Sequence, residues 1–212
     1  MIDHIGLDRD GGTKVAQPSK RAAILNAGRA EFHERGYNAT GIAGITTRAE
    51  GAHKGSFYNH FPSKEDLAIE VITDYGKSQR MEMLRDSSVE PLARIQAHFE
   101  FMAEELRKEG LHLGCLLGNF AAEMSSETPR MRATVIGNFT AWSGLLAAAL
   151  DEAADIRSAD GHDSETTAWL MIDAYEGAAL RGRATDSPAP MNSFITIGLP
   201  QMLRAFAEHY TG

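Results

Sequence analysis

Apolar residues recur three and four positions apart along most of the chain after Ser19, which is the spacing of amphipathic helices. The first predicted helix begins at Ser19 and carries Ile24 and Phe32 on its apolar face. Gly36 should end this helix, because glycine readily adopts the left-handed conformation that terminates one. The pattern therefore predicts an all-α protein that begins with one long helix.

A second, shorter helix is predicted at residues 42–49, where the apolar positions form one narrow stripe. Thr40 is placed to cap this helix, because its hydroxyl can accept a hydrogen bond from a first-turn amide that has no partner within the helix. Gly51 is placed to end it. Residues 51–53 then form a small turn before the next apolar run.

That next run, residues 54–60, is too short to be stable as an isolated helix. It needs Phe57 and Phe61, four positions apart, to pack on the neighbouring helices. Ser63 is a good N-cap for the longer helix that follows, so Lys64 stands at a helix N-terminus, where backbone amides and an ammonium can share a phosphate. Two short helices joined by a small turn are the outline of a helix-turn-helix.

Helical periodicity continues to the end of the chain. The remaining helices are predicted at residues 64–84, 91–109, 111–124, 129–150, 164–184 and 192–210, with a polar break at 158–163. Pro91 and Pro129 stand at first-turn positions, where a proline costs no helical hydrogen bond. The stretch at 111–124 is apolar nearly all round, which predicts that it is buried.

The block from Ser19 to Asp66 resembles the N-terminal DNA-binding domain of the TetR family of bacterial repressors. The resemblance rests on the RGY-N-A-T ending of the first helix, the short helix and turn, and the sequence KGSFYNHFPSKEDL. It implies a three-helix head at residues 18–64 and a helical ligand-binding and dimerisation body at residues 65–212, with about nine helices in all. Residues 1–17, with three glycines and no periodicity, are expected to be a disordered tail.

The resemblance also implies which residues of the head meet DNA. They lie between the end of the first helix and the start of the fourth: Thr40, Lys54, Gly55, Ser56, Tyr58, Asn59, His60 and Lys64. Tyr58, His60 and Lys64 would hold phosphates. The other polar side chains of the second short helix would approach base edges, where Asn59 can pair bidentately with adenine and Lys54 with guanine.

The net charge of the chain, −8, at first argues against a nucleic-acid partner. Residues 19–64, however, carry seven Lys and Arg against three Glu, a net +4, whereas residues 65–212 carry −11. A basic head on an acidic body would orient the protein on a duplex, because only the head gains from counterion release.

The resemblance implies that the last two helices form a homodimer interface with the same pair in a second subunit. Small residues would allow close approach and larger apolar ones would supply area: Gly177, Ala178, Gly182 and Ala184, with Trp169, Leu170, Ile172 and Phe194. A monomer that buries these helices internally is the alternative. Pro200, inside the last helix, removes a backbone hydrogen bond and should kink or restart it near Leu199.

A small-molecule inducer is expected in the body, among residues of several helices: Cys115, Asn119, Phe120, Trp142 and Tyr175. Aromatic residues at helical spacing are equally typical of plain core. Cys115 lies in GCLLGNFAAEMS, which is similar to the branch of the family that includes the electrophile- and acrylate-responsive repressors NemR and AcuR, where a cysteine in a GCL stretch is the proposed sensor. A buried, unreactive thiol is the alternative, because a reactive one needs an electropositive, partly open setting that only Arg181 or Arg183 could supply.

These features predict a dimeric, ligand-responsive repressor that binds a palindromic DNA operator and is released by a small molecule or a reactive electrophile. The alternative is a helical dimeric adaptor that keeps the head only as structure. No enzyme is expected, since the chain lacks the phosphate-binding, dinucleotide-binding, HExxH and GxSxG motifs. The single cysteine excludes a Cys-cluster metal site, and neither metal nor cofactor is expected. With no hydrophobic signal segment and no apolar run of about 18 residues, we expect a cytoplasmic protein without a membrane partner.

Overall fold

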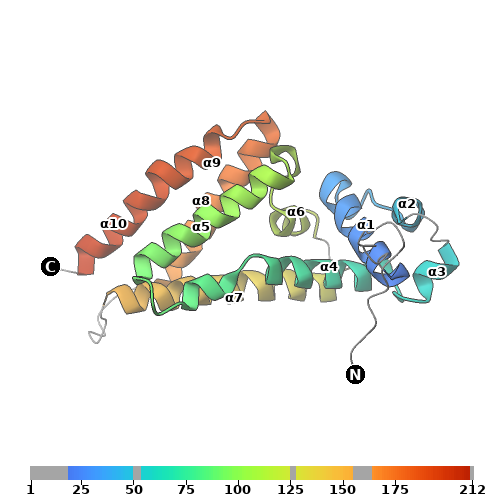
Figure 1. Cartoon of the computed structure of the whole chain (residues 1–212), viewed down its shortest axis with the longest axis horizontal. Coiled ribbons are helices and arrows are strands. Elements are labelled where there is room, and N and C mark those ends of the chain that lie inside the picture. Colours follow the sequence, from blue (N-terminus) through green and yellow to red (C-terminus); the bar gives the residue numbers. More distant parts are fainter. Residues whose placement is uncertain (1–18, 50–53, 125–127, 155–163, 211–212) are drawn as a thin grey trace, which may run out of the picture.

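The computed structural model describes residues 19–49, 54–124, 128–154 and 164–210, which fold into helices and their connecting turns (Figure 1). In chain order these are α1 (Lys20–Arg35), α2 (Ile42–Arg48), α3 (Lys54–Tyr58), α4 (Lys64–Ser78), the 3-10 helix η1 (Met81–Arg85), α5 (Pro91–Glu109), the 3-10 helix η2 (Leu111–Leu113), α6 (Leu116–Ala122), α7 (Pro129–Ala153), α8 (Ser164–Thr185), α9 (Ala189–Ser193), the π-helical turn η3 (Phe194–Gly198) and α10 (Leu199–Tyr210). The predicted all-α class is confirmed. The predicted tail, the turn at 51–53 and the polar break at 158–163 lie outside the described residues.

The head is built from α1, α2 and α3, which pack on one another at one end of the molecule (Figure 1). Its core includes Phe57 and Phe61, which are 0% and 2% exposed, with ring centroids 5.9 Å apart. Ile24 of α1 and Ile45 of α2 are fully buried beside them. The prediction that the short α3 depends on Phe57 and Phe61 for its anchorage is confirmed.

The turn between α1 and α2 differs from the prediction at Thr40. The N-cap of α2 is Gly41, and no side chain caps this helix. The hydroxyl of Thr40 instead donates to the carbonyl oxygens of Gly36, at 2.7 Å, and Glu31, at 3.1 Å. The last carbonyls of a helix lack donors within the helix, so the hydroxyl stabilises the end of α1 rather than the start of α2.

Helix α4 leaves the head and continues along α7 in the body (Figure 1). Ser63 caps it as predicted, accepting a hydrogen bond from the amide of Asp66 at 3.1 Å. The helix ends at Ser78 rather than at Leu84, because Arg80 adopts a left-handed conformation, φ 51°, before η1 begins. The buried guanidinium of Arg94 in α5 then donates to the carbonyl of Leu84 at 3.1 Å, which fixes η1 against the body.

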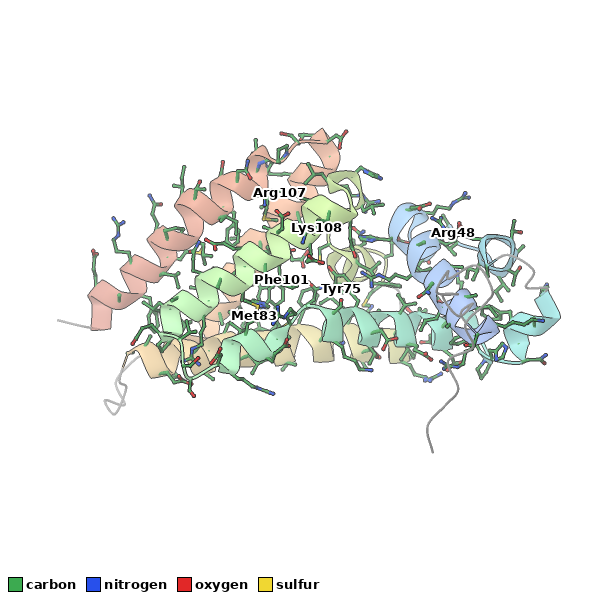
Figure 2. The ribbon with its side chains drawn as sticks, viewed as in Figure 1. Arg48, Tyr75, Met83, Phe101, Arg107 and Lys108 are labelled. Atoms are coloured by element: carbon green, nitrogen blue, oxygen red, sulfur yellow. The ribbon has the colours of Figure 1, made fainter. Side chains whose placement is uncertain are left out.

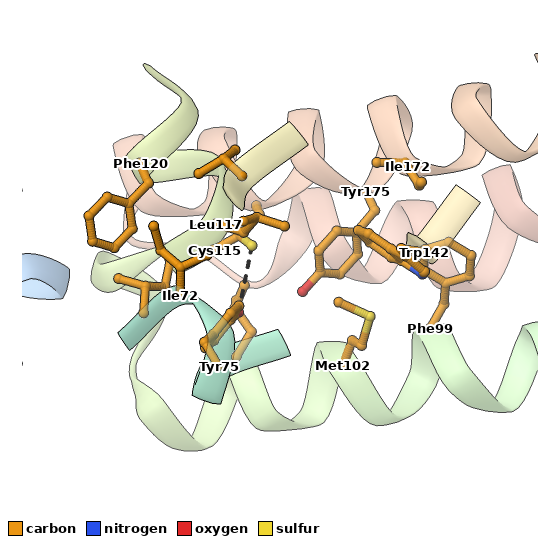
Figure 3. Close-up of a cluster of buried hydrophobic side chains, with 14 of the residues drawn as sticks. Ile72, Tyr75, Phe99, Met102, Cys115, Leu117, Phe120, Trp142, Ile172 and Tyr175 are labelled. Carbon is orange, nitrogen blue, oxygen red and sulfur yellow. Dashed lines mark hydrogen bonds between the residues drawn. The ribbon is translucent and has the colours of Figure 1, made fainter. Parts of the chain in front are cut away.

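The body core forms where α7 packs on α4, α5 and α8. Figure 3 shows Phe99, Trp142 and Tyr175, from three of these helices, packed together with their rings inclined to one another. The centroid of Phe99 lies 5.6 Å from that of Trp142 and 5.8 Å from that of Tyr175. Among the described helices, α7 is the one whose length and apolar composition would allow it to cross a membrane, a composition that a central core helix also has.

The last helical segment is interrupted where the sequence predicts. Helix α9 passes into the π-helical turn η3, and the amide of Leu199 donates to the carbonyl of Phe194, five residues earlier. Pro200 cannot donate a backbone hydrogen bond, and its ring conflicts with the carbonyl of the preceding turn in a regular α-helix. A single wide turn relieves that conflict, and α10 continues from it.

The predicted dimer residues of the last helices divide into two groups. Ala178, Gly182, Ile172 and Phe194 are buried within the single chain, so they belong to the body core and cannot supply interface area. That part of the prediction is wrong, because the inner face of α8 packs against α7 of its own chain. Gly177, Ala184 and Leu170 are exposed, and Trp169 is half-buried.

The packing of α3 gives a stability test with an adjacent control. Phe57→Ala removes a fully buried ring and should lower the free energy of unfolding by about 3–5 kcal/mol. Tyr58→Ala removes a ring that is 50% exposed and should cost less than about 1 kcal/mol. Chemical denaturation of both variants measures the difference. Equal losses would show that α3 is not anchored through Phe57.

Candidate functional site

The outward face of α3 presents most of the predicted DNA-contacting residues together. Lys54, Gly55, Tyr58 and Asn59 are exposed. Ser56 and His60 are half-buried beside them. This face stands on the buried rings below it, since Tyr58 packs edge-to-face on Phe57 at a centroid distance of 5.4 Å. A polar ridge on a rigid apolar base can enter a groove without reshaping itself.

Gly55 contributes space rather than a side chain. A Cβ built at Gly55 would have no atom of the protein within 4 Å, so nothing in the fold requires glycine there. Because Gly55 has no side chain, the backbone at the start of α3 is uncovered and can approach a ligand closely.

Lys64 is the first residue of α4, as the sequence predicted, but its ammonium is directed into the head. Its ammonium donates to the carbonyl oxygens of Tyr37, at 2.8 Å, and Thr40, at 2.9 Å, and lies 4.1 Å from the centre of the Tyr37 ring. Burial lowers the pKa of this ammonium from its usual value. Lys64 therefore ties the start of α4 to the turn after α1, and its charge is occupied within the head.

Thr40 is also withdrawn from the surface, being 2% exposed with its hydroxyl hydrogen-bonded to α1. Its side chain cannot reach a phosphate in this conformation. The six remaining residues of the predicted set are the ones that the structure brings together on α3 and in the turn directly after it, which holds Asn59 and His60.

Ion pairs hold most of the other cations of the head. Arg48 of α2 points back to α1 (Figure 2), where its guanidinium donates to both carboxylate oxygens of Glu34, at 2.6 and 2.7 Å, and to Glu31 at 3.2 Å. The hydrogen bonds to Glu34 raise the pKa of Arg48 and lower that of Glu34. Arg21 is paired with Glu70 of α4. Lys54 has no ion pair among the described residues, so its charge is available to a partner.

A pocket of about 430 Å³ opens in the body between α6, α7 and α8. Cys115 and Asn119 line it, as the sequence analysis proposed. The side chains of Phe120, Trp142 and Tyr175 do not line it. They are 1–2% exposed and pack in the body core, which is where aromatic residues at helical spacing most often lie. Their assignment to the ligand site is therefore not supported by the geometry.

The sequence pointed to Trp169 and Arg183 as possible neighbours of the ligand or of Cys115, but it did not predict that one face of α8 forms a wall of the pocket. The residues of this wall are spaced three and four positions apart: Trp169, Asp173, Glu176, Leu180 and Arg183. This mixed aromatic, acidic and basic face is the pattern that could have revealed it, because a helix that only packs in a core has an apolar face. Phe139 of α7 closes the opposite side.

The thiol of Cys115 lies at the inner edge of the pocket, 4% exposed. Its sulfur is 3.6 Å from the hydroxyl of Tyr75, the contact drawn as a dashed line in Figure 3. Burial and the neighbouring carboxylate of Glu176 raise the pKa of Cys115 well above its usual value. The guanidinium of Arg183 donates to Asn119 Oδ1 at 2.6 Å. Its hydrogen-bond partner is therefore the amide of Asn119 and not the sulfur of Cys115.

Helix α6 connects this pocket to the head at both of its ends. Gly114, just before α6, accepts a hydrogen bond from His33 Nε2 of α1 at 2.8 Å. Glu123, just after α6, accepts one from the backbone amide of Asn38 at 2.8 Å. Both Gly114 and Glu123 also line the pocket.

Comparison with known proteins separates the two halves of the chain. Residues 24–71 match the model of bacterial regulatory proteins of the tetR family, and residues 91–196 match that of the C-terminal domain of LmrA/YxaF-like transcriptional regulators. The chain is 30% identical over 193 residues to the HTH-type transcriptional repressor DhaR of Mycobacterium sp. strain GP1, covering 89% of this chain and 95% of DhaR. The chain belongs to the TetR family of transcriptional regulators.

Two further TetR-family proteins agree over nearly the whole length. The transcriptional regulator AcuR of Cereibacter sphaeroides is 31% identical over 193 residues, covering 89% of this chain and 84% of AcuR. The crystal structure of a regulatory protein TetR from Rhodobacter sphaeroides has a TM-score of 0.74 and 29% identity, covering 91% of this chain and 99% of that one. The relatives are regulators rather than enzymes, and the family resemblance read from KGSFYNHFPSKEDL is confirmed.

Replacing Lys54 and replacing Lys64 should have different effects, the first on the salt dependence of DNA affinity and the second on thermal stability. Lys54→Met should remove one phosphate or base contact per head and reduce the slope of log affinity against log salt by about one for each head. Lys64→Met should lower the melting temperature, because it breaks two hydrogen bonds to backbone carbonyls, and leave the salt slope unchanged. DNA titrations at several salt concentrations distinguish the two. A reduced slope for Lys64→Met would place its ammonium on DNA.

The setting of Cys115 predicts slow thiol chemistry. The thiolate is the reactive form, so a thiol whose pKa is raised reacts slowly at neutral pH. Iodoacetamide should label the native protein at least about tenfold more slowly than it labels free cysteine, and the denatured chain at an ordinary rate. Because Cys115 is the single cysteine, mass spectrometry follows the reaction without ambiguity. Native labelling as fast as that of free cysteine would support an electrophile sensor.

Proposed function

We propose that this TetR-family protein is a dimeric repressor that binds a palindromic operator through α3 and releases it when a small molecule occupies the pocket between α6, α7 and α8. The observation that carries the proposal is the face of α3, where Lys54, Tyr58 and Asn59 are exposed together on a buried aromatic base. A repressor that binds operator DNA would act in the cytoplasm, as the bacterial regulators of this family do.

The DNA contacts follow from side-chain chemistry. Asn59 and Lys54 are the base-reading candidates, since an amide pairs bidentately with adenine and an ammonium donates to the two acceptors of guanine. Ser56 can hydrogen-bond to several bases and adds less discrimination. Tyr58 and His60 hold phosphates at the edge of the groove. Lys64 and Thr40 support this surface from beneath rather than touching DNA.

Dimerisation is supported by apolar side chains left uncovered on α8 and the last helical segment. Leu170 and Leu180 on α8 are 53% and 66% exposed, and Ile197 in η3 is 56% exposed. Gly177 lies between the two leucines on α8, is exposed, and has no protein atom within 4 Å of a Cβ built there. Leu180 and Gly177 also line the pocket. A second copy packing on α8 and η3 would bury these exposed residues beside the pocket and hold two heads at a set distance, about 34 Å for half-sites one helical turn apart.

The route from pocket to head runs through α6. A ligand that moves α6 alters the hydrogen bonds that Gly114 and Glu123 make with His33 and Asn38. Because these bonds hold the end of α1, the head changes its position relative to α4. Operator affinity then falls by the ratio of the ligand's affinities for the two arrangements. Release by alkylation of Cys115 is not favoured, given its burial.

The experiment that tests the function is selection of bound DNA by the full chain from random or genomic fragments. A repressor enriches one palindrome, with half-sites about 34 Å apart. Binding to heparin without an enriched sequence would indicate a basic surface only. Failure to retain DNA at all would favour the helical adaptor.

The selected operator allows the base contact to be tested. Asn59→Ala should cost about 1–3 kcal/mol on the operator and relax the base preference at one position of each half-site. Asn26→Ala makes the same change at an exposed position of α1 that lines a surface pocket shared with the body, and should leave the preference intact. An unchanged preference in Asn59→Ala would remove Asn59 from the base-reading set.

A further inference from the structure

The pocket in the body is lined by Glu176, whose carboxylate lies beside the thiol of Cys115 and has one oxygen without a hydrogen-bond partner among the described residues. This oxygen, Oε1, is inaccessible to solvent. The carboxylate packs against Gly118, where a Cβ would lie 2.2 Å from Glu176 Oε2. A buried carboxylate oxygen without a donor is costly in free energy unless a ligand or a proton satisfies it.

The other charged groups of the pocket do not supply that donor. Arg183, the cation that lines the pocket, donates to Asn119 Oδ1 at 2.6 Å. Glu123 already accepts the amide of Asn38, and Asp173 is an exposed carboxylate on the same wall. Acidic side chains therefore outnumber basic ones along the described lining, and Glu176 keeps one unpaired oxygen there.

We propose that the pocket binds an organic cation, an amine or amidine carried on an apolar body, whose nitrogen donates to the carboxylate of Glu176. This proposal rests on the pocket that the proposed function uses. An N–H donor in the pocket would pair with the carboxylate of Glu176, which lines it, and the positive charge would be favoured by the neighbouring carboxylates. An anionic ligand would meet those same carboxylates and is disfavoured.

The rest of the lining fits the apolar body of such a ligand. The volume of about 430 Å³ lies in the usual range for small-molecule sites. Trp169 and Phe139 supply aromatic surface, which attracts cations as well as apolar groups.

Proton exchange at Glu176 gives the interaction a direction with pH. Burial raises the pKa of Glu176 to about 7, so at neutral pH a proton partly occupies the carboxylate in the absence of a ligand. The titratable and charged groups around it come from three parts of the chain: Tyr75 of α4, Cys115 just before α6, and Asp173, Tyr175 and the Asn119-bound Arg183 of α8. A cation binds the ionised form, so its affinity should rise by about tenfold from about pH 6 to about pH 8, as the ionised fraction increases.

The test uses the full chain and three probes with one shared body: phenylbutylamine, phenylbutanol and phenylbutyrate. Calorimetric titration should show that the amine binds at least about tenfold more tightly than the alcohol at pH 8, and that the carboxylate binds most weakly. Glu176→Gln should bring the amine and the alcohol within about twofold of each other and abolish the pH dependence. Asp173→Asn, on the same wall, is the control and should keep most of the preference.

Two measurements separate the possible outcomes. The melting temperature of Glu176→Gln should be no lower than that of the natural protein, because the variant removes a buried ionisable group, and its ligand-free operator affinity should be the same, which shows that the variant folds. Equal binding of amine and alcohol, a retained preference in Glu176→Gln, or no binding of the amine at millimolar concentration would each overturn the proposal. Amine binding by a chain that enriches no DNA would refute the repressor function and leave the ligand class standing, whereas operator binding without amine preference would do the reverse.

Discussion

The turn at residues 36–40 is the point where α1, α2, α4 and α6 meet, and the position of the head depends on it. Gly36 adopts φ +83°, and a Cβ there would lie 1.9 Å from a carboxylate oxygen of Glu123. Lys64 donates to two carbonyl oxygens of the turn, and the hydroxyl of Thr40 closes it against α1. These are hydrogen bonds between segments far apart in the sequence, so α6 and α4 both act on the same few backbone atoms. A change at either helix would therefore act on the turn that joins α1 to α2.

Charge in this molecule is divided between groups that have partners and groups that do not. Arg48 and Lys64 belong to the first kind, since a carboxylate or backbone carbonyls hold them inside the head. Among the described residues, Lys54 on α3 and one oxygen of Glu176 in the pocket belong to the second kind. The net charge of +4 in the head therefore overstates the positive charge that is available to DNA. In the pocket, by contrast, the carboxylates of the described lining outnumber its single cation, Arg183. Lys54 and Glu176 therefore mark the two surfaces, α3 and the pocket, where a charged group is available to a binding partner.

The sequence was sufficient for features that depend on neighbours within one or two helical turns. Ser63 caps α4, Phe57 and Phe61 are buried, and Pro200 coincides with the wide turn before it, because capping, amphipathic spacing and a missing amide are local properties. The family followed from a contiguous motif for the same reason. The prediction was wrong at Thr40, whose hydroxyl could either accept from the first amides of α2 or donate to the last carbonyls of α1, and it does the second. Only the packed turn decides between two acceptable partners.

By itself the sequence determined an all-helical chain, a helix-turn-helix head of the TetR family and the outward polar face of α3, since periodicity and a contiguous motif carry that information. The tertiary structure decided which side chains are available. It turned Lys64 inward, placed Trp142 and Tyr175 in the core, and joined Cys115 to Glu176 across 61 positions of sequence. Whether a polar group faces solvent, a partner or a cavity depends on elements distant in the chain, and burial sets the protonation of Cys115 and Glu176 only once those elements have packed.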